Sequence, residues 1–159
     1  MSTTGGRRHL RRAVLAGVRD LSAASDLLDA ATADHLSMHR TDLRCLDSLA
    51  RAGPLSAGQL GEAVGLTSGA LTIAVDRLER AGYVERRPDP ADRRRVLVAL
   101  APRADGVVAL FDELRGPTLQ RLRGYSDEQL QLLSTFLQDT SSILSDQAKS
   151  ILRRPKRAV

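Results

Sequence analysis

The apolar positions of this chain recur mostly at helical spacing. Leucine, valine and alanine fall every three or four residues at Leu10, Val14, Val18, Leu21, Ala24 and Leu28. This spacing places them on one face of a helix. It predicts a long amphipathic N-terminal helix over residues 9–33, preceded at residues 1–8 by a loose tail of small and basic residues.

Two short helices with clear start signals are predicted in the middle of the chain. Ser56 followed by Gln59 forms a capping box, which predicts a helix that stops at Gly65. Thr67 is a cap for the next helix, which ends at Gly82. Two short helices joined by a tight turn that contains glycine are typical of a helix-turn-helix unit.

A further helix is predicted before this unit, after a junction at residues 34–40. Thr41 is the expected cap of that helix, and Gly53 with Pro54 is expected to end it. Its apolar stripe is Leu43, Leu46, Leu49 and Ala50. The wider DNA-binding region is therefore predicted over residues 41–101.

A β-hairpin pattern follows the helix-turn-helix unit directly. Two β-prone runs within residues 84–100 flank a loop that holds Pro88, Asp89, Pro90 and Asp92, residues that favour a rigid turn. The hairpin carries five arginines, Arg86, Arg87, Arg93, Arg94 and Arg95. Their guanidinium groups repel one another unless a polyanion faces them. A stiff basic hairpin after a helix-turn-helix unit indicates a winged DNA-binding module.

The C-terminal third predicts two more helices. Pro102 opens the first, and Gly116-Pro117 is expected to kink or break it. Ser126 with Gln129 is a second capping box, and a leucine stripe follows it to Ile151.

The predicted fold class is mostly α with a small β-hairpin wing, in a single domain over residues 1–159. The terminal helices, residues 9–33 and 102–152, carry more leucine than one small winged domain can cover. We therefore expect two chains to share these stripes in a homodimer.

The charge distribution supports a polyanionic partner. The formal net charge is +5, with +4 in residues 1–12, +5 in residues 149–159 and −4 between them. Basic tails that only aid solubility are the alternative for the two ends. Cys45 is the single cysteine, which excludes a disulfide within the chain and fits a reducing compartment. No apolar run reaches membrane-spanning length, so we expect a cytoplasmic protein with no membrane contact.

The helix after Thr67 is the predicted reader of DNA bases. Major-groove readers use the N-terminal half of such a helix. Ser68 and Thr72 can hydrogen-bond base edges or phosphates, and Ala70 and Ile73 can contact thymine methyls. Arg77, on the later face, suits a phosphate.

From Thr41 to Leu100 the chain resembles the MarR family of bacterial winged helix-turn-helix regulators. The matching stretches include Leu60-Gly61-Glu62-Ala63-Val64-Gly65-Leu66, Val75 to Arg86, and Asp89-Pro90-Ala91-Asp92-Arg93-Arg94-Arg95. Asp92 and Arg94 match the Asp-x-Arg of the family's wing, whereas Ala101 stands where threonine is usual and Gly106 comes two residues late. The resemblance implies a homodimer on double-stranded operator DNA, repression of nearby genes, and release by a small, often aromatic, effector.

These observations define the predicted DNA-binding set. Arg77 and Arg86 are expected to hold phosphates. The Asp92 carboxylate is expected to hold the Arg94 guanidinium by a bidentate hydrogen bond and to aim it into the minor groove. The full set is Ser68, Gly69, Ala70, Thr72, Ile73, Arg77, Arg86, Asp92, Arg93, Arg94 and Arg95.

The junction before Thr41 contains candidate effector residues. Family ligand pockets lie near this junction, which makes His35, Met38 and His39 candidates. His35 and His39 also have the i, i+4 spacing of a metal pair, without the glutamate of a zinc-protease motif, and Asp34 or Asp42 could complete a site. Cys45 lies among leucines, where cysteine usually packs as a small apolar group rather than acting as a redox sensor.

The preferred interpretation is a ligand-responsive, sequence-specific repressor that needs no cofactor. No acid–base or nucleophile constellation indicates an enzyme. The alternatives are a sequence-indifferent architectural DNA-binding protein, a winged domain used only for protein contacts, and a redox- or metal-responsive regulator that uses Cys45 or the pair His35 and His39.

Overall fold

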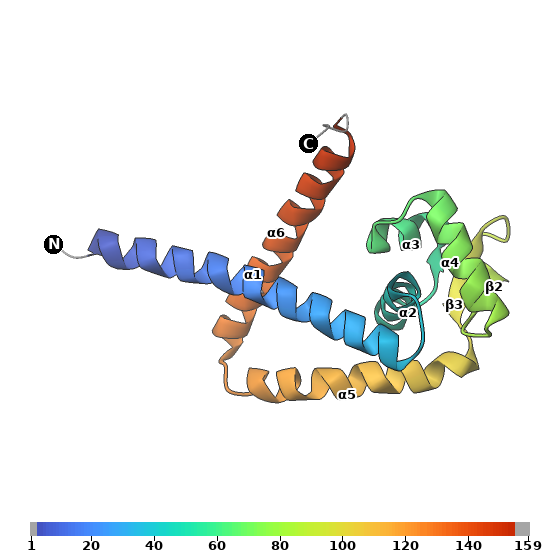
Figure 1. Cartoon of the computed structure of the whole chain (residues 1–159), viewed down its shortest axis with the longest axis horizontal. Coiled ribbons are helices and arrows are strands. Elements are labelled where there is room, and N and C mark those ends of the chain that lie inside the picture. Colours follow the sequence, from blue (N-terminus) through green and yellow to red (C-terminus); the bar gives the residue numbers. More distant parts are fainter. Residues whose placement is uncertain (1–2, 155–159) are drawn as a thin grey trace. The chain divides into compact units, whose positions relative to one another are not determined.

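The computed structural model describes residues 3–154 and the side chains of residues 6–154. It confirms a mostly helical fold with a small antiparallel sheet (Figure 1). The contacts divide the chain into two compact units, Met1–Phe111 and Asp112–Val159. In chain order the elements are α1 (Thr3–His35), α2 (Arg40–Ala52), β1 (Leu55–Ser56), α3 (Ala57–Val64), α4 (Ser68–Arg80), β2 (Val84–Pro88), β3 (Val96–Leu100), the 3₁₀ turn η1 (Pro102–Ala104), α5 (Asp105–Leu122) and α6 (Asp127–Leu152).

Helix α1 is longer than its apolar stripe predicts. It begins at Thr3, so the prediction of a loose tail through residue 8 is wrong for residues 3–8. An existing helix gains one hydrogen bond for each residue that it adds, and it therefore extends past the point where its apolar pattern stops. Residues 1–2 of that tail and residues 155–159 of the basic C-terminal segment lie outside the described residues.

Helix α2 begins one residue before the predicted cap. His39 is the N-cap, without a side-chain cap bond, and Thr41 is already helical. The His39 carbonyl accepts hydrogen bonds from the backbone amides of Asp42 (2.9 Å) and Leu43 (3.1 Å). Because the His39 carbonyl accepts the first hydrogen bonds of the helix, His39 and not Thr41 occupies the N-cap position.

The start signals of α3, α4 and α6 are confirmed. Ser56 with Gln59 and Ser126 with Gln129 both form complete capping boxes. The Thr67 hydroxyl accepts a hydrogen bond from the Ala70 amide at 3.3 Å. These caps satisfy amides that have no partner inside the helix.

The wing is the predicted hairpin with one extra strand. β2 pairs with β3 from Val84 opposite Leu100 to Pro88 opposite Val96. On its other edge, β3 pairs with β1, which places Leu55 opposite Val98. The sheet order is therefore β1-β3-β2. Sequence analysis did not predict β1, because two residues are too short to show an alternating pattern.

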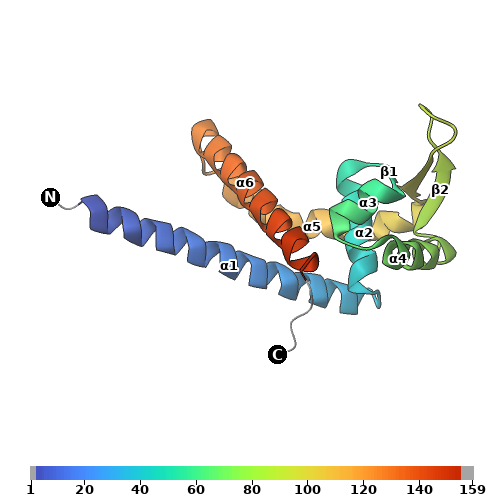
Figure 2. The same ribbon diagram turned by 90° about the horizontal axis from the view of Figure 1, so that it is seen from above.

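The hydrophobic core lies under the helix-turn-helix unit and the root of the wing. It joins side chains of α2, α3, α4, the hairpin and the first turns of α5, and its largest fully buried members are Leu46, Leu49, Leu60, Leu78 and Cys45. In Figure 2 the loop between β2 and β3 extends beyond these helices. Packing in this core therefore holds the inner face of α4 and the root of the hairpin. The outer face of α4 and the tip of the hairpin are exposed to solvent.

The C-terminal helices differ from the expected pattern at one point. α5 continues through Pro117 to Leu122, so Gly116-Pro117 does not break it. Glu113 and Pro117 are both exposed, so water can satisfy the Glu113 carbonyl that Pro117 leaves without a donor. Among the described residues, none of the helices combines the length and apolarity of a membrane span.

Candidate nucleic-acid interface

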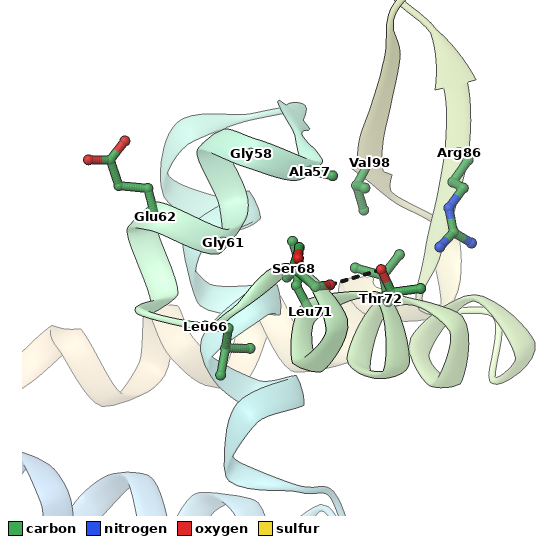
Figure 3. Close-up of a pocket in the computed structure, with 11 residues that line it drawn as sticks. Ala57, Gly58, Gly61, Glu62, Leu66, Ser68, Leu71, Thr72, Arg86 and Val98 are labelled. Carbon is green, nitrogen blue, oxygen red and sulfur yellow. Dashed lines mark hydrogen bonds between the residues drawn. The ribbon is translucent and has the colours of Figure 1, made fainter. Parts of the chain in front are cut away.

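The outer face of α4 presents small side chains and one large apolar side chain. Ser68, Gly69, Ala70, Thr72 and Ile73 are all exposed, whereas Leu71, Ala74, Val75 and Leu78 are buried in the core. The predicted reading residues therefore share one solvent-facing surface. Figure 3 shows the Thr72 hydroxyl bonded to the Ser68 carbonyl, at 2.9 Å.

Arg77 does not project from this surface as a free cation. Its Nε and one terminal nitrogen donate to the two carboxylate oxygens of Asp42, at 2.6 and 2.5 Å. Asp42 is buried on α2, and the hydrogen bond to its carboxylate raises the pKa of Arg77 above its ordinary value. The structure thus gives Arg77 an internal partner that sequence analysis missed. Its phosphate contact remains a prediction.

Arg86 links the wing to α4. Its guanidinium donates to the Asp76 carboxylate at 2.6 Å and also pairs with Glu79. Its backbone amide donates to the same Glu79 side chain at 3.2 Å. The hydrogen bond to Asp76, partly opposed by burial, raises the pKa of Arg86 above its ordinary value. Strand β2 is therefore held to the C-terminal half of the reading helix by an ion-pair cluster.

The tip of the wing is shaped by two aspartates. The Asp89 carboxylate accepts from the Ala91 amide at 2.9 Å, and that of Asp92 accepts from the Arg94 amide at 3.1 Å. The predicted side-chain pair between Asp92 and Arg94 is absent: the Asp92 carboxylate instead lies 3.5 Å from Nε of Arg95. A turn residue bonds most readily to the backbone two positions ahead, and this geometry takes the carboxylate away from the Arg94 side chain.

The arginines of the wing tip remain directed at solvent. Arg93, Arg94 and Arg95 are all exposed on the loop that joins β2 to β3. Among the described residues, Asp92 is the only acid that forms an ion pair with any of them, and its partner is Arg95. The tip therefore keeps a positive potential that can act on an external polyanion.

A cleft of about 220 Å³ lies between α3, α4 and the wing. Figure 3 shows Ser68, Thr72 and Arg86 on its α4 and wing sides and Ala57 and Gly58 on its α3 side. Sequence analysis did not predict this cleft. The small residues at the start of α3 are its one signal in the sequence.

A second pocket, of about 400 Å³, lies at the junction of α1 and α2. Of the three residues predicted to bind an effector, Met38 and His39 line this pocket and His35 does not. Its other lining residues, which were not predicted for this site from the sequence, include Arg77, Tyr83 and Arg103. The Arg103 guanidinium lies over the Tyr83 ring, 5.0 Å from its centre.

The remaining candidates are a thiol and a metal pair. Cys45 is fully buried, and burial raises the pKa of its thiol to about 11, with the nearby Asp42 carboxylate adding to the shift. The thiol is therefore protonated at neutral pH. No group of three or more histidine, cysteine or acidic side chains able to hold a metal ion occurs in the described part of the chain.

The helix-turn-helix unit and the adjoining β-hairpin define a winged helix-turn-helix protein, the fold of many transcriptional regulators. Sequence comparison identifies the family within this class of proteins. The sequence model of the MarR family matches residues 38–96, and an uncharacterized HTH-type transcriptional regulator of Bacillus subtilis (strain 168), YcgE, is 38% identical over 152 residues, covering 95% of this chain and 99% of that protein. The chain belongs to the MarR family.

Two solved structures share the fold. One is NadR in complex with 4-hydroxyphenylacetate, with a TM-score of 0.66 and 21% identity over 82% of this chain and 93% of that chain. The other is Streptococcus pneumoniae FabT in complex with DNA, with a TM-score of 0.58 and 20% identity over 82% of this chain and 96% of that chain. Both similarities concern the fold alone.

Proposed function

We propose that this regulator is a homodimeric repressor that binds a pseudo-palindromic operator through α4 and the wing. The observation that carries the proposal is the presence of two uncovered reading elements on one core: the exposed first turns of α4 and the exposed arginines of the wing tip. The α4 helix fits a major groove and the arginines fit the adjoining minor groove. FabT, which shares the fold, was solved in complex with DNA.

The dimer is supported by apolar surface that the single chain leaves exposed. Leu10, Val14, Leu21 and Leu28 of α1 are all exposed. Helix α6 has no buried residues, and Leu133, Leu137, Leu144 and Ile151 are exposed along it. A second copy is the simplest cover for such stripes, and a two-fold dimer places two reading helices about one DNA turn apart.

Selection of bound duplexes from a random pool tests the proposal. A two-fold dimer selects an inverted repeat whose half-sites are about one helical turn apart. Failure to enrich any sequence, together with a steep salt dependence, would instead favour an architectural protein that reads only phosphates. Full binding after Arg93, Arg94 and Arg95 are all changed to alanine would favour a winged domain used for protein contacts.

The junction pocket is the proposed effector site. Its Leu36 and Met38 wall is apolar, and Arg103 and His39 can face an anion, whereas Arg77 is already paired with Asp42. This combination suits a small aromatic carboxylate, and NadR was solved with such a molecule. Titration with 4-hydroxyphenylacetate tests the pocket. We expect Arg103→Ala to weaken binding and Arg51→Ala, at an exposed ion pair on α2, to leave it unchanged. Equal affinity in all three proteins would place the effector elsewhere.

A further inference from the structure

The reading half of α4 contains no side chain that can contact guanine with two hydrogen bonds. Guanine is most often read by arginine or lysine, and adenine by asparagine or glutamine. None of these residue types occurs from Ser68 to Ile73. Arg77 is bound to Asp42, and Nε of Arg80 donates to the Asp76 carbonyl at 3.1 Å. Base recognition by this half of the helix must therefore rely on other chemistry.

Ile73 is the large side chain that this surface offers. It is 63% exposed, although isoleucine is among the residue types most often buried. The core face of the helix is already complete without it, since Leu71, Ala74 and Val75 fill that side. Folding of the single chain thus gives no reason for isoleucine at this position. In a major groove the apolar group that such a side chain meets is the C5 methyl of thymine.

Thr72, the neighbour of Ile73, adds a preference for a base that donates a hydrogen bond. Its hydroxyl proton is committed to the Ser68 carbonyl at 2.9 Å, so its oxygen meets an incoming base as an acceptor. In the major groove the donors are the amino groups of adenine and cytosine. An A·T pair supplies both groups that these neighbours favour, an amino group for Thr72 and a methyl group for Ile73.

Gly69 lets the helix backbone come close to the DNA. A Cβ added at Gly69 would meet no atom of the chain within 4 Å, and its φ is not in the left-handed region. Neither packing nor backbone conformation therefore requires glycine here, although glycine lowers helix stability relative to alanine. The open space lies on the same exposed turn as Ala70 and Ile73. Glycine at this exposed position leaves room for an external surface to approach the backbone closely.

We propose that α4 selects A·T pairs by close contact with thymine methyl groups, with Ile73 as the residue that determines this specificity. The inference rests on the proposed DNA-binding function and deepens it by naming the chemical feature of the operator that is read. Gly69 and Ala70 allow the approach, Ile73 covers a methyl group, and Thr72 accepts from an adenine amino group.

Replacing single thymines by deoxyuridine tests the proposal, because this change removes only the C5 methyl. In the best duplex selected from a random pool, we expect one or more thymines in each half-site at which uracil weakens binding by about fourfold, as for one buried methyl group. Ile73→Ala should abolish this discrimination, and Ile73→Val should retain most of it. As a matched control, Val96→Ala, at an exposed apolar residue of the wing, should leave it intact.

The outcomes separate this inference from the proposed function. Specific binding with no sensitivity to uracil at any thymine, or with sensitivity unchanged in Ile73→Ala, would overturn methyl recognition and leave the operator-binding function standing. Failure of the wild-type protein to select any sequence would overturn both.

A pair of glycine substitutions tests the close approach separately. Gly69→Ala should raise the melting temperature or leave it unchanged, yet weaken binding by about tenfold or more, as a misfit base contact does. Gly106→Ala, at an exposed glycine of α5 that also has no atom within 4 Å, should have the same effect on melting and none on binding. Equal affinities of the two variants would contradict the close approach.

Discussion

The guanidinium of Arg77 and the carboxylate of Asp42 form a two-point ion pair that joins the reading helix to α2. The two hydrogen bonds measure 2.6 and 2.5 Å, and the Asp42 side chain is almost completely buried. Planar two-point contacts fix orientation as well as distance. Asp42 and Arg77 also line the junction pocket. The pair therefore sets the position of α4 next to the proposed effector site.

A double-mutant cycle at this pair separates positioning from phosphate contact. We expect Asp42→Ala to reduce the free energy of unfolding by roughly 1–3 kcal/mol, because it leaves a partly buried guanidinium without its partner. Arg77→Ala should then cause a smaller further loss than it does alone. If Arg77 only positions the helix, the salt dependence of DNA binding stays unchanged. A decrease in the salt slope of about one unit on Arg77→Ala would instead show a phosphate contact.

Arg94 is predicted to act in the minor groove. We expect Arg94→Ala to weaken binding to many sequences, because minor-groove arginines respond to groove width and negative potential more than to base identity. The salt slope should fall by about one unit, for one released counterion. Titrations of one selected duplex at several salt concentrations measure both effects. An affinity loss confined to a single sequence would contradict the minor-groove role.

Asp92 is predicted to act through the backbone of the wing tip. Its carboxylate accepts the Arg94 amide at 3.1 Å, and the amide oxygen of asparagine can accept the same bond. We therefore expect Asp92→Asn to bind DNA as tightly as the wild type or more tightly, and Asp92→Ala to bind more weakly. Tighter binding by both variants would show that Asp92 only repels phosphates.

The apolar stripe of α1 is predicted to form part of the dimer interface. Leu21→Glu should shift the protein toward monomer and weaken operator binding, because it places a charge in a shared apolar seam. Leu27→Glu is the matched control, since Leu27 is exposed on the same helix but lies outside the stripe. Sedimentation at micromolar protein concentration measures both variants. A Leu21→Glu protein that stays dimeric would remove α1 from the interface.

Cys45 is predicted to be unreactive in the folded protein. With its pKa raised to about 11 from 9.0, its thiolate fraction at pH 7.5 is roughly one hundredth of that in the unfolded chain. Alkylation should therefore be slow until the protein unfolds. The thiol contributes stability that is fully present below pH 9 and is lost as the pH rises through the folded-state pKa.

Two variants test the same residue in a peroxide assay. Neither Cys45→Ser nor Cys45→Ala should alter DNA binding or its response to peroxide. The serine variant is expected to be the less stable, because its hydroxyl is buried among leucines. Peroxide-induced release that both substitutions abolish would make Cys45 a sensor.

The sequence predicted the elements whose signals are local. The capping boxes at Ser56 and Ser126 and the positive φ of Gly82 each depend on residues a few positions apart, and all three are present. Cys45 is also buried, as its leucine neighbours indicate. Such features follow from the chain's own spacing before any tertiary contact forms.

Long-range partners could not be predicted in the same way. Arg77 and Asp42 are separated by 35 positions, and nothing in the spacing of either residue indicates the other. The Asp92 carboxylate was predicted to pair with Arg94, but in the structure it pairs with the next arginine, Arg95. β1 exists because β3 offers it an edge. Each of these contacts depends on tertiary packing, about which local sequence patterns carry no information.

The sheet order β1-β3-β2 has a consequence for self-association. Because β3 lies between the other two strands, β2 is an outer strand whose free edge is open to another chain, except where the Arg86 amide donates to Glu79. Exposed strand edges promote aggregation, and charged side chains and proline oppose it. Glu85, Arg86 and Arg87 are exposed along β2, and Pro88 ends the strand without an amide donor. The same basic strand that faces DNA in the proposed complex therefore also keeps the free protein from pairing edge to edge.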